Sequence, residues 1–318
     1  MLFDVKDIEI RERFCKDNNL SIKLFQSPYF EERLSLYRKH FHTEQSEEEF
    51  MKVFSTVGNV QKYFELYNKL KDDIISYLNE NERMIFFSQK EDMNKFSIKH
   101  KNLPKTSIYK PSFDGKVMLS LDMKKANFTS LKLYDPTIVK NKETYEEFVR
   151  EFTDYEYFTK SKYIRQVVFG NVNPKRQTTF SQYLMDKVLD RVDEILSAER
   201  VVSFQVDELV FDLENLSDEE ILAIRTQIKE LVKVIKEELN INLTLETFYL
   251  KKVEHTQGYV KKLFDENGEL PYIFKGFDSI ELPFILRKYL GEEIQESDLV
   301  FFYEGRLAKL LEIPKVEL

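Results

Sequence analysis

Apolar residues recur at three- and four-residue spacing through the first 92 residues, with no alternating Val/Ile-rich run among them. The pattern is clearest in 27–41 and 59–82. Side chains at this spacing share one face of a helix, so the pattern predicts a helical N-terminal domain over residues 1–94. Ser27 and Ser46 each precede acidic residues and are candidate N-caps.

The pattern changes after residues 95–112, a Lys-rich stretch with two prolines that we interpret as a basic linker. Residues 116–123 form a short apolar run that ends near an Asp, which is typical of a buried strand. Two more short runs flank residue 206, and alternation over 242–264 predicts further strands. A hairpin turn is expected at Asn267 and Gly268.

Helical patterns are interleaved with these strands. We expect helices over 142–153, 154–169 and 173–200, the last with Asn173 as N-cap and Pro174 at the first helical position, and another over 218–239. The predicted fold class is therefore α+β: the helical domain, a domain over 113–277 with an antiparallel sheet, and a helical region over 278–318.

The composition excludes several classes of protein. The chain has 318 residues, 42% of them hydrophobic, and no long uncharged apolar run, so we expect a cytoplasmic protein without a membrane span. One cysteine and four scattered histidines argue against an internal disulfide and against structural zinc. The net charge is −8, but residues 95–113 and 159–176 each carry five basic residues and no acid. Either a solvated surface or a nucleic-acid contact explains such runs.

Carboxylates lie at the ends of two predicted strands. Asp122 is near the end of the first strand, and Asp207 and Glu208 are adjacent in an otherwise apolar hairpin. Carboxylates on neighbouring strands can hold two Mg²⁺ or Mn²⁺ ions for phosphoryl transfer. Burial without a cation would cost several kcal/mol or neutralise the group, so the alternative is a strand end open to water.

Three segments, in order, resemble motifs A, B and C of A-family nucleic-acid polymerases: LSLDMKKANF, RQVVFGNVNP and FQVDELVFDL. In the third segment Val206 stands where the family has His, and Asn173-Pro174 replaces the Tyr-Gly that closes motif B. The likeness covers residues 113–213. It implies a polymerase-like palm of reduced size, with short fingers helices over 154–198.

The resemblance also implies roles for individual residues. Asp122 and Asp207 would be catalytic metal ligands, and Glu208 an auxiliary catalytic carboxylate near the primer end. Arg165, together with Lys162, would bind the incoming triphosphate, a role that suits a guanidinium because it binds phosphate oxygens bidentately.

Two further positions would contact the nucleotide. Phe169 would pack against its sugar, with ordinary core packing as the alternative. Asn127 lies where related palms often place a bulky side chain that excludes a ribose 2′-hydroxyl, so the shorter Asn raises ribonucleotide use as a hypothesis.

The predicted function is template-directed nucleotidyl transfer, with nucleic-acid template and primer and nucleoside triphosphates as partners. The nucleic-acid channel would be lined by the basic residues Lys99, Lys101, Lys105, Lys175 and Arg176. The Lys-, Asn- and Ile-rich composition suits an AT-rich viral or phage source. Two alternatives stay open: an inactive palm-derived nucleic-acid-binding or scaffold protein, and another metal-dependent nucleotidyltransferase or nuclease. The choice between DNA and RNA template is also open.

Overall fold

The computed structural model describes residues 6–264 and 272–311, and the fold is α+β as predicted. Within these residues there are twelve α-helices, a six-stranded antiparallel sheet and a two-stranded sheet. The N-terminal region is helical, which confirms the prediction from its apolar spacing. Its helices are α1(Ile8–Asp17), α2(Tyr29–Phe41), α3(Glu44–Val57), α4(Val60–Glu80) and α5(Glu82–Gln89).

The predicted caps of α2 and α3 are wrong. Pro28 occupies the N-cap position of α2, and the Ser27 hydroxyl instead donates to Glu31. Helix α3 begins at Glu44, so Ser46 lies inside it and donates to Asn18. In both places the serine hydroxyl donates to another side chain, and neither helix has a side-chain hydrogen bond at its N-cap.

The main sheet has the strand order β2-β3-β1-β4-β5-β6, with every neighbouring pair antiparallel. The strands are β1(Val117–Met123), β2(Val201–Phe204), β3(Glu208–Asp212), β4(Leu243–Lys252), β5(Tyr259–Leu263) and β6(Tyr272–Lys275). Strand β1, the helices after it, the β2-β3 hairpin, α11(Asp218–Leu239) and β4 follow the β-α-β-β-α-β order of a split βαβ unit. The predicted strands are thereby confirmed, while the turn at Asn267 and Gly268 lies outside the described residues.

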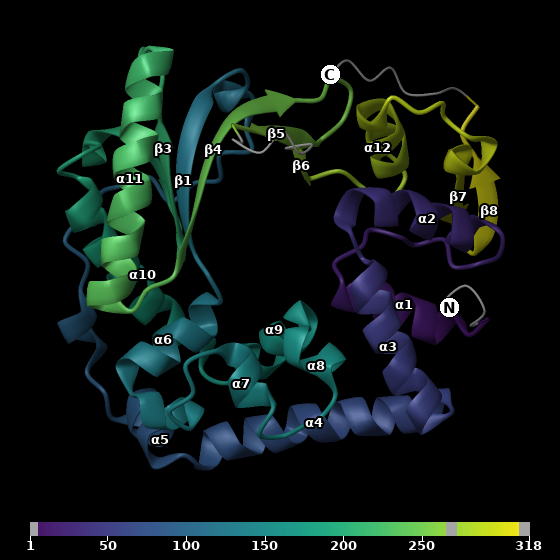
Figure 1. Ribbon diagram of the computed structural model, residues 1–318, viewed down its shortest axis with the longest axis horizontal. Helices are drawn as coiled ribbons and strands as arrows, with labels where there is room; N and C mark the ends of the chain where they lie inside the picture. The colour runs from purple at the N-terminus through teal and green to yellow at the C-terminus, as the bar shows by residue number, and fades with distance from the viewer. Residues whose placement is uncertain (1–5, 265–271, 312–318) are drawn as a thin grey trace.

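Alternation along β1 gives the sheet two different faces. Leu119, Leu121 and Met123 join the main core, beneath the helices α10 and α11 that flank the sheet in Figure 1. Met118 packs on the opposite face with residues of β3, β4 and β5 and with Ile108 from the basic segment. Asp122 is four residues from Met118 along β1 and therefore points to the same face, opposite the one that α10 and α11 cover.

The region between β1 and β2 contains α6(Ala126–Tyr134), α7(Tyr145–Val149), α8(Glu156–Lys160), α9(Lys162–Gly170) and α10(Pro174–Val192). Asn173 caps α10 and Pro174 is its first residue, as predicted, but the helix ends eight residues before the expected 200. The two helices expected over 142–169 are instead three short ones. Thr144 and Ser161 each cap a new helix through the hydroxyl, which divides the segment.

The elements form a ring in Figure 1, with α4 along its base. The ring closes where α2 packs against α12(Leu282–Leu290). There the buried Arg33 donates to the carbonyls of Ser297, Asp298 and Val300 at 2.9–3.1 Å. The region over 278–318 was predicted to be helical, but beside α12 it also holds the paired strands β7(Val300–Tyr303) and β8(Arg306–Lys309). Helix α2 of the first region and residues 282–300 are therefore in contact.

Short 3₁₀ helices complete the structure: η2(Met93–Phe96), η3(Pro111–Phe113), η4(Pro136–Val139), η5(Ala198–Arg200) and η6(Glu296–Leu299). The basic segment, residues 95–112 that the sequence predicted as a linker, packs on α10 and on the main sheet. The Asp186 carboxylate on α10 accepts from the backbone N–H groups of Lys99 and His100, and Phe204 of β2 donates to the Pro104 carbonyl. The segment thus passes from α10, past the β2 edge, to the sheet face that carries Asp122. The proposed domain boundaries stay a prediction.

Candidate active site

Pairing of the central strands gathers carboxylates at one end of the sheet. Asp122 on β1 lies directly opposite Glu208 on β3, and the Asp207 carbonyl just before β3 accepts from the Met123 N–H at 2.8 Å. Glu246 on β4 pairs with Ser120, two residues before Asp122, and so lies on the same face. These four carboxylates line one cavity of about 460 Å³.

The cluster carries negative charge that the protein offsets only in part. Burial, followed by repulsion from Asp207, Glu208 and Glu246, raises the pKa of Asp122 to about 7. Burial likewise raises the pKa of Asp207 and of Glu208. Among the described residues, no group donates a hydrogen bond to the Asp122 carboxylate or forms an ion pair with it. An added cation would therefore find a favourable place beside Asp122.

Lys261 on β5 forms ion pairs with two carboxylates of the cluster. Its side chain is buried, with Nζ 3.0 Å from Glu246 and 3.8 Å from Glu208, and it lies 4.2 Å from the Phe248 ring centroid. Burial alone would lower the pKa of Lys261, but its acidic neighbours raise it overall, so the ammonium stays charged. Lys261 therefore forms its ion pairs with Glu208 and Glu246, and its charge stabilises the Asp122 carboxylate without an ion pair to it.

Sequence reasoning missed both Glu246 and Lys261. Alternation along β4 predicts that Glu246 shares a face with Phe248. That Glu246 lies near Asp122 depends on β1 lying between β3 and β4, which the sequence does not reveal. Predicting Lys261 also requires the pairing of β4 with β5. Lys261 lies on β5, opposite Leu250 of β4. No local motif carries that information.

The opposite wall of the cavity belongs to α9 and the start of α6. Ser161 caps α9 by accepting from the Ile164 N–H, and this start presents Lys162 and Arg165 to the cavity. The Arg165 guanidinium lies 5.6 Å from the Tyr145 ring centroid and has no ion-pair partner among the described residues. Burial lowers the pKa of this guanidinium below its ordinary value. The structure thus places six of the predicted site residues around one cavity: Asp122, Asn127, Lys162, Arg165, Asp207 and Glu208.

Two other predicted residues lie elsewhere and have structural contacts. Phe169 is fully buried in the main core, 6.2 Å from the Tyr145 ring, so its side chain is not available to a nucleotide in this structure. Arg176 donates to the carbonyls of Phe87 and Glu91 at 2.8 and 2.6 Å, which ties α10 to the end of α5. The predicted ligand contacts of Phe169 and Arg176 therefore lack support, because packing and backbone bonds occupy these side chains.

The four predicted nucleic-acid-binding lysines are all exposed, outside the carboxylate cavity. Lys99 pairs with Asp190 at 2.8 Å. Lys101, Lys105 and Lys175 have no ion-pair partner within the described part of the chain, so their charges are free to attract an anion. Their contact with nucleic acid stays a prediction.

Comparisons with protein-family models, with curated proteins and with solved structures find no match. In the part of the chain that the structure describes, no helix combines the length and apolar character that crossing a bilayer requires.

The cavity offers oxygen donors of the type that Mg²⁺ and Mn²⁺ prefer. Across the described ranges, no group of three or more His, Cys, Asp or Glu residues could hold a metal ion by itself. Mg²⁺ is commonly held by one or two carboxylates together with water and substrate phosphates. Asp122 and Asp207, which line the same cavity, supply two carboxylates of this kind.

Proposed function

We propose that this chain catalyses template-directed nucleotidyl transfer, adding a nucleoside monophosphate to a primer 3′-hydroxyl with release of pyrophosphate. The observation that carries the proposal is the cavity itself. Asp122 and Glu208 on the sheet, with Asp207 just before β3, line it together with Arg165 and Lys162 on α9. A nucleoside triphosphate with its divalent cations matches both walls, because the cations suit the carboxylates and the phosphates suit the basic side chains.

Each side chain then has a defined task. Asp122 and Asp207 would hold two Mg²⁺ ions, which when bound would lower the pKa of the attacking hydroxyl and neutralise charge on the pyrophosphate. Arg165 and Lys162 bind the triphosphate and keep the α-phosphate in line with the primer end. Lys261 fixes the orientation of Glu208 and Glu246 through its two ion pairs.

The position of Asn127 bears on the choice of sugar. Asn127 is the second residue of α6 and lines the same cavity as the carboxylates and Arg165. We propose that its short amide leaves space for a ribose 2′-hydroxyl, so that ribonucleotides are accepted along with deoxynucleotides. Asn127→Phe would then reduce ribonucleotide use selectively.

Primer extension tests the proposed reaction. The wild type is assayed with Mg²⁺ or Mn²⁺ on DNA and RNA templates, beside Asp207→Asn, Arg165→Ala and the control Glu237→Gln, which changes an exposed carboxylate on α11. Extension by the wild type and the control, with at least a hundredfold loss in Asp207→Asn, is the expected result. Degradation of the primer or random tailing would instead indicate a nuclease or an untemplated transferase.

One observation favours a second candidate, an inactive nucleic-acid-binding or scaffold protein on the same fold. Lys261 already pairs with Glu208 and Glu246, and such a network can serve stability alone. Under this candidate, Asp207→Asn changes no measurable property, and nucleic acid binds without any incorporation.

A further inference from the structure

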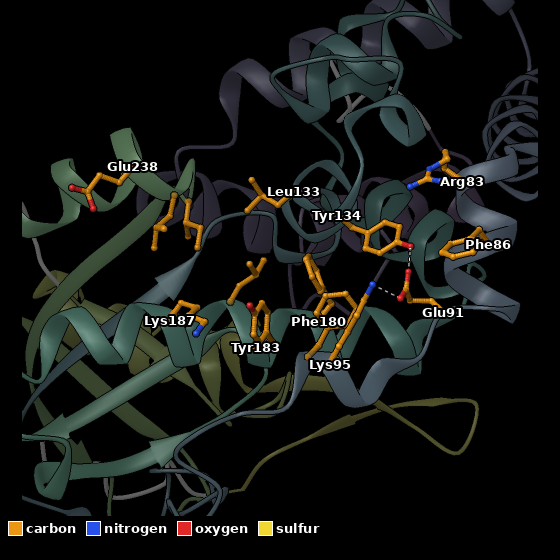
Figure 2. Close-up of a pocket in the computed structure, with 14 residues that line it drawn as sticks. Arg83, Phe86, Glu91, Lys95, Leu133, Tyr134, Phe180, Tyr183, Lys187 and Glu238 are labelled. Atoms are coloured by element: carbon orange, nitrogen blue, oxygen red, sulfur yellow. Dashed lines mark hydrogen bonds and ion pairs between the residues drawn. The ribbon is translucent and has the colours of Figure 1, made fainter.

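A second cavity, of about 750 Å³, lies at the other end of α6 from the carboxylates. Ala126 and Asn127 at the start of α6 line the carboxylate cavity, whereas Leu133 and Tyr134 at its end line this one. Figure 2 shows its lining side chains, which come from α5, η2, α6, α10 and the end of α11. Its volume falls in the range of ordinary small-molecule sites.

Aromatic rings form one wall of this second cavity. Phe180 and Tyr183 project from the same face of α10, as Figure 2 shows, and Phe96 of η2 packs against both at 4.9 and 5.5 Å between ring centroids. Tyr134 joins them from α6, 5.8 Å from Phe180. Tyr134 and Tyr183 remain partly exposed, so a planar ring entering the cavity would meet aromatic surface.

The charged groups at the cavity leave one cation in excess. In three ion pairs the positive and negative charges cancel: Arg83–Asp135, Lys95–Glu91 and Arg191–Glu238. Lys187 is exposed, lies 5.3 Å from the Tyr183 ring centroid, and has no ion-pair partner among the described residues. In Figure 2 it follows Tyr183 along α10, beside the aromatic wall. An anionic group therefore has a preferred place next to the rings.

A polar group lies in the same cavity. Glu91 is 7% exposed, accepts a hydrogen bond from the Tyr134 hydroxyl and pairs with Lys95, and Figure 2 shows both contacts. A carboxylate has more acceptor capacity than these two donors require. It can accept from the exocyclic amine of a heterocycle that stacks nearby.

We propose that this cavity binds a nucleobase that carries a phosphate, with the base on the aromatic wall and the phosphate at Lys187. The ligand is either a free nucleotide or the end of a single strand, since the two share this chemistry. The basic segment favours the strand, because it leaves the cavity at Lys95 and continues with the exposed Lys101 and Lys105. The inference does not depend on catalysis at the carboxylates.

Binding is measured with the double variant Asp122→Asn, Asp207→Asn in EDTA, so that metal-dependent binding of nucleotide at the carboxylate cavity is removed. The probes are AMP, by calorimetry, and a fluorescein-labelled hexadeoxyadenylate, by anisotropy, because adenine carries the exocyclic amine that Glu91 would accept from. Into this background are introduced Lys187→Glu, Tyr183→Ala, Tyr183→Phe and the control Lys236→Glu, an exposed lysine on α11 outside the cavity. Thermal unfolding verifies that each variant is folded.

At least one probe is expected to bind, with affinity at least tenfold lower in Lys187→Glu and Tyr183→Ala and unchanged in Tyr183→Phe and Lys236→Glu. AMP binding as tight as that of the oligonucleotide identifies a nucleotide site, and binding of the oligonucleotide alone identifies a strand site. The proposal is overturned if neither probe binds at millimolar concentration. It is also overturned if ribose 5-phosphate binds as tightly as AMP, or if Lys187→Glu and Tyr183→Ala leave binding intact.

Discussion

Replacing Asp122 with Asn should stabilise the protein in the absence of divalent metal. The pKa of this carboxyl rises from 3.8 to about 7 on folding, because burial and three neighbouring carboxylates oppose its charge. Such a rise corresponds to an upper limit of about 4 kcal/mol, at about 1.4 kcal/mol for each tenfold change in proton affinity. The side chain is partly open to water, so screening reduces the effect, and we expect about 1–2 kcal/mol at pH 8.

The sign of the pH dependence follows from the same values. Below pH 3.8 the group is protonated in both states and has no effect on unfolding. Between pH 3.8 and about 7 the unfolded chain loses its proton while the folded protein retains it, so the wild type loses stability as the pH rises. Above about 7 the loss is complete. Asn stays neutral throughout, so the advantage of Asp122→Asn should grow from pH 5 to 7 and then level off.

Urea denaturation in EDTA at pH 5, 6, 7 and 8 measures this difference. The control is Asp154→Asn, an exposed carboxylate outside the cavity, which should follow the wild type. Adding Mg²⁺ at ten times its dissociation constant should stabilise the wild type by about 1.4 kcal/mol and Asp122→Asn by much less. The reasoning is refuted if Asp122→Asn is less stable than the wild type at pH 8, or if their difference does not change with pH.

Three other substitutions have defined outcomes. Arg165→Ala should raise the KM for the nucleoside triphosphate at least tenfold, with Arg165→Lys intermediate; equal KM values in steady-state kinetics would contradict its phosphate contact. Lys261→Met should lower the free energy of unfolding by about 2–3 kcal/mol, partly recovered by adding Glu246→Gln; urea denaturation showing no loss would mean the ion pairs are not formed. Arg33→Ala should lower the free energy of opening between α2 and the C-terminal part by about 2–3 kcal/mol, and so speed hydrogen exchange in α12. Unchanged exchange would argue against the hydrogen bonds of Arg33 to the carbonyls of Asp298 and Val300.

Periodicity and local signals were enough to predict the principal elements. Helix α11 matches the expected 218–239, because its apolar face is continuous and Ser217 with Glu220 forms a capping box at its start. Strand β1 and the β2-β3 hairpin also follow from short apolar runs bounded by polar residues. These features depend only on nearby residues, so a single sequence contains them.

Other features depend on which elements meet in space. Six of the predicted residues stand in short local motifs and line one cavity, but Glu246 and Lys261 required the strand order on both sides of β4. Phe169 could equally have faced a ligand or the core, and only the packing around α9 places it inside. The sequence predicts a free cation at Arg176, because the carbonyls that it binds lie 85 and 89 residues earlier and leave no local pattern.

Incorporation of a single nucleotide opposite a chosen template base tests the central claim most directly. A labelled primer is annealed to four templates that differ only in the first unpaired base, and each is incubated with Mg²⁺ and one triphosphate at a time. The account predicts that the wild type adds the complementary nucleotide on each template and that Asp207→Asn adds none. Addition that ignores the template base, equal addition by Asp207→Asn, or no addition while the duplex is bound would contradict it.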